Sequence, residues 1–323
     1  MNWTLLFPGQ GSQAPGMGRW LYDNFTEAKQ TFEEGSDALN LDLKKLIFDG
    51  SEADLALTEN TQPALLCVST ATQRVLRKQL NPTIKAAAGH SIGEYAALVA
   101  AGSIRYNEAM QAVRARGQAM QSAVPVGQGG MTAILGLDDD QVRWLCENAV
   151  KTSGFGPLSP ANFNSPGQVV ISGSQKAIDW LKNNFKPEEI PGSPRRAKLI
   201  PLTVSAPFHC EMMKPAEEKM RLVLTAMNFE KPEFSICQNF TAKLEAEPAT
   251  LRENLIRQVS APVLWTQSML HLKEQGLANG VECGHGSVVK GLLKKIDGEF
   301  FHVSSLSTLD DLKALESQIK SAN

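Results

Sequence analysis

The most reactive pattern in the chain is a serine between two glycines, in the segment Gly89-His90-Ser91-Ile92-Gly93. Residues 84–88 before it form a short apolar run typical of a buried strand, and an alanine-rich helical segment follows it up to residue 101. On a tight strand-to-helix turn a serine points outward, and the glycines let the backbone approach neighbouring strands. The start of the helix directs N–H groups toward the same point, where they can stabilise an oxyanion. We therefore predict that Ser91 is a nucleophile; the alternative is a chance match, because Gly and Ser are common in turns.

A serine nucleophile needs a base, and the chain contains five histidines. His209 follows Ala206-Pro207-Phe208 at the end of a predicted strand, where the catalytic loops of α/β sheets gather, so it is the first candidate. His285, in the turn Gly284-His285-Gly286, is the second. The other three histidines are not expected to be catalytic. His90 belongs to the serine turn, His271 to a solvated helix and His302 to a strand.

Two further segments could bind a substrate. The turn Gly9-Gln10-Gly11 could hold a phosphate or form part of an oxyanion hole, although it lacks the Lys-Ser/Thr pair of a P-loop. Arg116 lies in a predicted helix over residues 107–123, where an arginine is usually a solvated charge. It gains a specific role only if the substrate carries a carboxylate, which a guanidinium group binds through two hydrogen bonds.

The elements that must position these residues alternate between strand and helix, which indicates the α/β class. The segment 131–202 has the order β-α-β-β-α-β, which is that of a ferredoxin-like split unit. We expect it to form a small inserted domain, residues 127–197, within a larger domain made of residues 1–126 and 198–323. Residues 17–80 are expected to be helical, with interruptions at Asp49-Gly50 and near Pro63.

Composition excludes several other classes of protein. With 323 residues, of which 42% are hydrophobic, and a net charge of −2, the chain resembles an ordinary globular protein with no bulk attraction for nucleic acid or an anionic membrane. Its apolar runs are far shorter than the ~20 residues of a membrane span, and the N-terminus does not read as a signal peptide. The five cysteines are widely spaced without a C-x-x-C pair, which argues against disulfides and zinc. We expect a cytoplasmic protein without a metal or cofactor.

Five segments, in family order and spread over nearly the whole chain, resemble the malonyl-CoA:acyl carrier protein transacylases. They are residues 7–13, 89–95, 159–173, 205–209 and 262–265. The resemblance implies an α/β-hydrolase-like large subdomain with an inserted ferredoxin-like small subdomain, in agreement with the insert expected from the pattern of elements.

The resemblance also implies a role for individual residues. Ser91 matches the nucleophile and His209 the general base, while Gln258 matches the residue that orients the histidine in place of an aspartate. Gln10 and Ile92 match the residues whose backbone N–H groups form the oxyanion hole. Arg116 matches the arginine that binds the carboxylate, and Asn162 matches a residue of the pocket. Phe208, next to the base, is expected to fill the space that an α-methyl branch of the substrate would need.

Three positions depart from the family pattern. Ile92 stands where leucine is usual, which has little consequence if only its backbone N–H acts. Cys210 follows the histidine where serine is common and is a candidate for a reactive thiol. His285 replaces the proline of a Gly-Pro-Gly turn.

The function implied is a ping-pong transfer of malonyl from coenzyme A to the phosphopantetheine thiol of holo acyl carrier protein, in fatty acid biosynthesis. Three alternatives remain open at the level of sequence. One is an acyltransferase of a polyketide or malonate decarboxylase system. Another is a serine thioesterase, although such an enzyme usually has an acidic residue behind its base. The last is a carrier-protein-binding subunit without activity.

Overall fold

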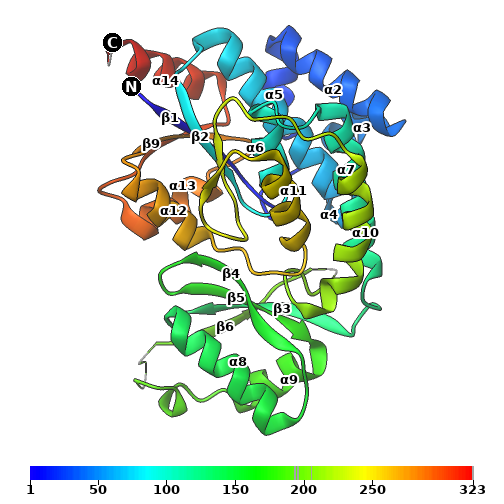
Figure 1. Cartoon of the computed structure of the whole chain (residues 1–323), viewed down its shortest axis with the longest axis vertical. Helices are drawn as coiled ribbons and strands as arrows, with labels where there is room; N and C mark the ends of the chain where they lie inside the picture. The colour runs from blue at the N-terminus through cyan, green and yellow to red at the C-terminus, as the bar shows by residue number, and fades with distance from the viewer. Residues whose placement is uncertain (193, 195, 205, 322–323) are drawn as a thin grey trace.

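The computed structural model describes residues 1–192, 194, 196–204 and 206–321. Ser205, the first residue of the segment that ends in His209, lies outside the described residues. The described chain contains a six-stranded sheet and a separate four-stranded sheet, both associated with helices (Figure 1). No helix within these ranges is long and apolar enough to cross a membrane.

The large sheet has the strand order β10-β9-β1-β2-β7-β8. Neighbouring strands are parallel except for the last pair, β7 and β8. The strands are β1 (Trp3–Phe7), β2 (Ile84–Gly89), β7 (Ser235–Cys237), β8 (Leu244–Glu245), β9 (Asn279–Cys283) and β10 (His302–Leu306). All five residues of β1 are buried, as expected for a central parallel strand covered by helices on both faces.

Alternate side chains of the central strands pack into two different cores. Leu5 and Phe7 join the larger core, whereas Leu6 between them points to the opposite face and packs in the core that includes α12 (Trp265–Glu274) and α13 (Val288–Asp297). The larger core takes its helical residues from α1 (Arg19–Asn24), α2 (Thr26–Leu39), α3 (Leu43–Asp49), α4 (Glu52–Ala56), α5 (Thr58–Leu80), α6 (Gly93–Ala100), α7 (Tyr106–Ser122), α10 (Lys214–Ala226), α11 (Pro248–Arg257) and α14 (Leu309–Ser321).

One expected helix break is wrong. Helix α5 continues through Pro63, and the interruption lies instead at Leu57, whose extended backbone caps the helix. Pro63 falls in the second turn, where it removes a single backbone hydrogen bond. Most of this helix is buried, so tertiary packing outweighs that local cost.

The small sheet contains β3 (Gly129–Leu135), β4 (Leu158–Ser165), β5 (Gln168–Ser174) and β6 (Lys198–Pro201) in the order β4-β5-β3-β6, with all neighbours antiparallel. Helices α8 (Asp139–Ser153) and α9 (Gln175–Asn184) pack on it and share a separate hydrophobic core. The insert was expected to end at residue 197, but β6 lies beyond that boundary. Its backbone pairs with β3, so this strand belongs to the small sheet.

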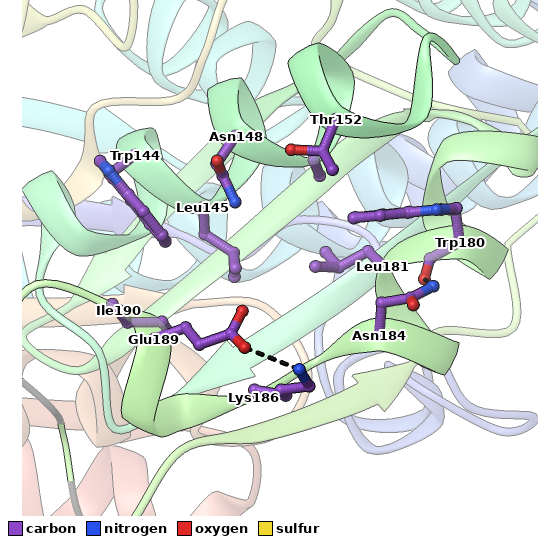
Figure 2. Close-up of a pocket in the computed structure, with 11 residues that line it drawn as sticks. Trp144, Leu145, Asn148, Thr152, Trp180, Leu181, Asn184, Lys186, Glu189 and Ile190 are labelled. Atoms are coloured by element: carbon purple, nitrogen blue, oxygen red, sulfur yellow. Dashed lines mark hydrogen bonds and ion pairs between the residues drawn. The ribbon is translucent and has the colours of Figure 1, made fainter.

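A cavity of about 390 Å³ lies between α8 and α9 (Figure 2). Trp144 and Trp180 stand on two sides of it, with Leu145 and Leu181 between them. It shares no lining residue with the cavity around Ser91 described below.

Backbone hydrogen bonds attach the small sheet to a segment that leads into α12, a helix that shares a core with the large sheet. Phe163 N–H donates to the carbonyl of Val263 at 2.9 Å, and Val263 N–H donates to the carbonyl of Ala161 at 2.8 Å. Strand β4 is thereby fixed against the segment that precedes α12. The polar residues of β4, including Asn162, are consequently held beside the end of β2.

The turn between β2 and α6 requires glycine at both ends. A Cβ atom on Gly89 would lie 2.0 Å from the Gly93 backbone, and one on Gly93 would lie 2.4 Å from the Phe7 carbonyl oxygen. Neither position has room for a side chain, because the helix start packs directly against the ends of β1 and β2.

We expect Gly93→Ala to lower the free energy of unfolding by about 1–3 kcal/mol, because backbone must move to admit a methyl group. The matched control is Gly291→Ala in α13, where an added Cβ meets nothing within 4 Å and the residue is exposed. That control should gain about 0.5–1 kcal/mol from its higher helix propensity. Denaturant unfolding of both variants measures the difference, and equal effects would contradict the close packing of the turn.

Candidate active site

Ser91 lies on the turn between β2 and α6 in a left-handed backbone conformation, with φ of 52°. This region is unfavourable for residues other than glycine, so the turn must be held by its surroundings. Asn239, two residues after β7, provides two of the contacts: its Oδ1 accepts the Ser91 N–H at 2.6 Å, and its Nδ2 donates to the Gly89 carbonyl at 2.7 Å. The strained turn is thus bridged by one buried amide side chain.

His209 is placed to act on the serine hydroxyl. Its Nε2 lies 2.7 Å from Ser91 Oγ, and its Nδ1 lies 2.9 Å from the Gln258 carbonyl oxygen and 3.2 Å from that of Ala261. Because a carbonyl oxygen can only accept, the proton of the neutral ring is on Nδ1. Nε2 is therefore the acceptor that faces the hydroxyl, which is the arrangement a general base requires.

Burial, and after it the positive charge of Arg116, lowers the pKa of His209 to about 3. Both causes disfavour the imidazolium form. Its hydrogen bonds to the two carbonyls oppose them only in part. The histidine is thus neutral in the resting site at neutral pH and is ready to accept a proton.

Arg116, from α7, is almost completely buried beside the serine. Its Nη2 donates to Ser91 Oγ at 3.1 Å and to Gln258 Oε1 at 3.0 Å, and its guanidinium lies 5.8 Å from the centre of the Tyr95 ring. Burial lowers the pKa of this arginine. Its Nε has no hydrogen-bond partner, and no carboxylate forms an ion pair with it, within the part of the chain that the structure describes.

A buried acid in α6, Glu94, accepts hydrogen bonds from the residues that hold Ser91 and His209. The Oε2 of Glu94 accepts hydrogen bonds from the Asn239 N–H at 2.8 Å and from Gln258 Nε2 at 3.0 Å, and its Oε1 accepts one from Gln238 at 3.0 Å. Burial raises the pKa of Glu94, against these hydrogen bonds and the charge of Arg116. The amide of Gln258 connects the two charges, since it accepts from Arg116 and donates to Glu94.

Two backbone N–H groups near the serine are available to an oxyanion. The N–H of Ser91 is already bound to Asn239, so it cannot serve. Those of Gln10 and Ile92 have no acceptor among the described residues, and both residues line the cavity around Ser91. The arrangement can therefore support attack by the serine on a carbonyl group.

The cavity has a volume of about 180 Å³ and brings together most of the residues singled out in the sequence. Its lining includes Gln10, Ser91, Ile92, Arg116, Asn162, Phe208 and His209. Gln258 lies fully buried behind His209 and is not part of the lining. His285, the second candidate base, does not line this cavity either.

Two expectations change in detail. Gln258 was expected to orient His209, and its contact with the ring is through the backbone carbonyl, while its side chain bonds Arg116, Glu94 and the Ser91 carbonyl. Cys210 was a candidate for a reactive thiol, but it is buried, and burial raises its pKa. A thiol with a raised pKa is a poor nucleophile, so this expectation is wrong.

Sequence reasoning missed three residues of the site. Asn239 and Glu94 act through contacts between segments that are far apart in the chain, which no local pattern reveals. Gln62, from α5, lines the cavity with its Oε1 buried and without a partner among the described residues. The histidine next to Ser91 in the chain, His90, binds Asn164 Oδ1 at 2.8 Å, whereas the hydroxyl of Ser91 is bound by His209.

Comparison with known proteins gives the family. The family model described as an acyl transferase domain matches residues 4–299. The malonyl CoA-acyl carrier protein transacylase of Salmonella typhimurium (strain LT2) is 42% identical over 295 residues, which cover 91% of this chain and 93% of that protein. The chain belongs to the malonyl CoA-acyl carrier protein transacylase family.

Solved structures of transacylases share its mixed α/β fold. The acyl-carrier-protein S-malonyltransferase of Burkholderia pseudomallei 1710b is 41% identical and superposes with a TM-score of 0.91, covering 98% of this chain and all of that one. A malonyl-transacylase solved in complex with a type II PKS acyl-carrier protein is 38% identical, with a TM-score of 0.91 and the same coverage.

The lowered pKa of His209 makes a prediction about pH. In the free enzyme, the rate at which an uncharged serine-directed organophosphorus reagent modifies Ser91 should stay constant from pH 8 to about pH 5. It should fall only as His209 is protonated, near its pKa of about 3. The rate is measured by mass spectrometry of the intact protein, with His209→Ala as the unreactive control. A half-maximal rate near pH 6.5, the value of an unperturbed histidine, would contradict the burial of the base.

Proposed function

We propose that the protein transfers a malonyl group from coenzyme A to the phosphopantetheine thiol of acyl carrier protein, through a malonyl ester on Ser91, in fatty acid biosynthesis. The observation that carries this proposal is Arg116, a buried cation without a carboxylate partner among the described residues, 3.1 Å from Ser91 Oγ. The charge favours an acyl group that brings its own anion. A malonyl group has a carboxylate one methylene group away from its reacting carbonyl.

In the first half-reaction, His209 Nε2 takes the hydroxyl proton while Ser91 Oγ attacks the thioester carbonyl. The N–H groups of Gln10 and Ile92 bind the oxyanion, and the loss of one such donor typically costs about 3–4 kcal/mol in the transition state. The tetrahedral intermediate then breaks its carbon–sulfur bond. The imidazolium of His209 protonates the leaving sulfur, so free coenzyme A and a malonyl-serine ester result.

In the second half-reaction, the phosphopantetheine thiol of the carrier protein gives its proton to His209 and attacks the ester carbonyl. The carbon–oxygen bond to Ser91 breaks, and the imidazolium returns the proton to Oγ. The serine is regenerated, and malonyl leaves as a thioester of the carrier protein. One base serves both steps because it begins each of them neutral.

Selectivity follows from the walls of the cavity. An acetyl group lacks the carboxylate and leaves Arg116 without its anion, so the transition state for acetyl transfer is less stabilised. Phe208 lies beside the base and is 7% exposed. Its ring occupies the space that an α-methyl branch would need, which favours malonyl over methylmalonyl.

The proposal includes the finer architecture. We infer an α/β-hydrolase-like large subdomain and a ferredoxin-like insert, because the order β4-β5-β3-β6 places the first and third strands of the unit at the centre. The insert proposed begins at residue 127 and includes β6. Residues 1–126 and the part of the chain that follows β6 form the large subdomain. The location proposed is the cytoplasm, supported by five buried and unpaired cysteines.

A second acceptor is favoured by one observation. The structural match to a transacylase in complex with a type II PKS carrier protein extends over 98% of this chain. Assays with carrier proteins of both pathways distinguish the two acceptors, since the chemistry at Ser91 is the same for both.

Intact-protein mass spectrometry after brief incubation with malonyl-CoA tests the function. We expect a malonyl adduct that is absent in Ser91→Ala, little adduct with acetyl-CoA, and discharge of the adduct when holo acyl carrier protein is added. Release of coenzyme A without an adduct would identify a thioesterase. Neither adduct nor release would contradict the transacylase function.

The role of Arg116 makes a quantitative prediction. Arg116→Ala should lower kcat/KM for malonyl-CoA by about 30- to 5,000-fold, which corresponds to the ~2–5 kcal/mol lost when one partner of a buried charge pair is removed. The rate with acetyl-CoA should change much less, so the ratio of the two rates separates lost recognition from general damage. The control is Arg105→Ala, an exposed arginine just before α7 that should behave as the unaltered enzyme. An unchanged ratio of malonyl to acetyl rates would contradict carboxylate recognition by Arg116.

A further inference from the structure

The carbonyl groups that hold His209 belong to a short turn rather than to a regular element. Gln258 caps the C-terminus of α11, and the chain then turns through residues 259–261. The N–H groups of Ser260 and Ala261 both donate to the Arg257 carbonyl, at 3.3 and 3.1 Å. These bonds define the turn itself, but they do not fix where it lies relative to the ring of His209.

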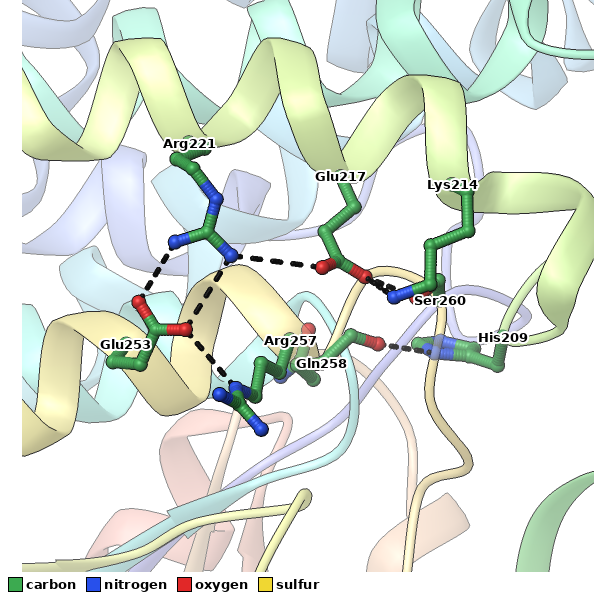
Figure 3. A network of polar contacts seen from close by, with 8 residues as sticks. All are labelled: His209, Lys214, Glu217, Arg221, Glu253, Arg257, Gln258 and Ser260. Carbon is green, nitrogen blue, oxygen red and sulfur yellow. Dashed lines mark hydrogen bonds and ion pairs between the residues drawn. The ribbon is translucent and has the colours of Figure 1, made fainter.

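A buried carboxylate reaches this turn from a different helix. Glu217 of α10 is 4% exposed and accepts a hydrogen bond from Ser260 Oγ through its Oε2 (Figure 3). The same oxygen accepts from Lys214 Nζ at 2.7 Å, and Oε1 lies 3.7 Å from Arg221 Nη2. Two cations therefore hold the carboxylate in one orientation, with an oxygen directed at the hydroxyl of Ser260.

The position of Glu217 in the chain gives this contact a geometric consequence. His209 and Cys210 are followed by a short 3₁₀ helix (Glu211–Met213) and then by α10, which carries Glu217 in its first turn. The hydrogen bond to Ser260 therefore joins the segment that bears the base to the turn that bears its two acceptors. Ser260 lies in the chain between those acceptors, Gln258 and Ala261, so the hydrogen bond of its side chain acts on the turn that carries both carbonyl oxygens.

We propose that Glu217 and Ser260 are positioning residues of the base, which hold both carbonyls against Nδ1 of His209 and so keep its Nε2 aimed at Ser91. The inference rests on the transferase function proposed above. Among the described residues no carboxylate bonds the base, and Nδ1 of its ring is held by two backbone oxygens. The positions of these oxygens depend on the turn. The turn is bonded through Ser260 to the carboxylate of Glu217, which Lys214 and Arg221 hold in place.

The test is a single-turnover measurement of malonyl-Ser91 formation in four variants. Ser260→Ala and Glu217→Ala should each lower the maximal acylation rate about 10- to 100-fold, the order expected when a catalytic group is misplaced by about 1 Å, with half-saturation by malonyl-CoA unchanged. Their combination should be no slower than Glu217→Ala alone, because both remove the same contact. Glu217→Gln should keep most of the rate, since its amide oxygen can still accept from Ser260.

The matched control is Glu253→Gln, which removes a carboxylate from the same cluster. Glu253 pairs with Arg221 at 2.8 Å and with Arg257 at 3.0 Å but makes no hydrogen bond to Ser260 or to the carbonyls that face His209. It should acylate as fast as the unaltered protein. A loss in Glu253→Gln equal to that in Ser260→Ala would mean that the cluster acts only on stability, and would overturn the proposal.

A second readout reports the orientation of the ring without any substrate. The hydrogen-bonded Nδ1 proton of His209 should give a downfield ¹H NMR signal, identified by its loss in His209→Ala. We expect the signal to persist in Glu217→Gln and to shift or broaden in Ser260→Ala. Unchanged rates and an unchanged signal in folded Ser260→Ala and Glu217→Ala would overturn the positioning role. Failure of the unaltered protein to form an adduct would count against the proposed function, while the NMR signal would still decide the positioning role.

Discussion

A buried cation beside Ser91 is the constraint on which the rest of the site depends. Removing a guanidinium from water is costly unless acceptors surround it. Arg116 finds two of them in Ser91 Oγ and Gln258 Oε1, and the Gln258 amide passes the interaction on to Glu94. The amide of Gln258 thus separates the guanidinium from the carboxylate of Glu94. The guanidinium therefore faces the cavity without contact to a carboxylate of the described residues, and the anion of an acyl group can bind it there.

The same charge explains how the base is supported. Burial, and after it the charge of Arg116, lowers the pKa of His209, so the ring stays neutral and needs no negative partner in the resting enzyme. A carboxylate at the position of Gln258 would lie within reach of Arg116 and would take the place of the substrate's anion. Backbone carbonyls orient the ring without adding a charge. The consequence is that the position of the base depends on a turn and on whatever holds that turn.

Local features of the site could be predicted from the sequence, because they are determined over a few residues. The glycines around Ser91 specify a strand–turn–helix, and hydrophobic periodicity specifies the alternating elements. Contacts between distant segments could not be predicted. Asn239 meets the turn only because β7 pairs with β2, and Pro63 stays helical because its neighbours are buried. Family resemblance named Gln258, but only the fold showed that its carbonyl meets the base and its amide meets the cation.

The most direct test of this account is a crystal structure of the protein loaded with malonyl from malonyl-CoA in the absence of carrier protein. The account predicts an ester on Ser91 whose free carboxylate forms two hydrogen bonds with the guanidinium of Arg116, at about 2.7–2.9 Å. The ester carbonyl oxygen should face the N–H groups of Gln10 and Ile92. A carboxylate directed into solvent, with Arg116 still bound only to Gln258, would contradict the claim that this buried cation selects the substrate.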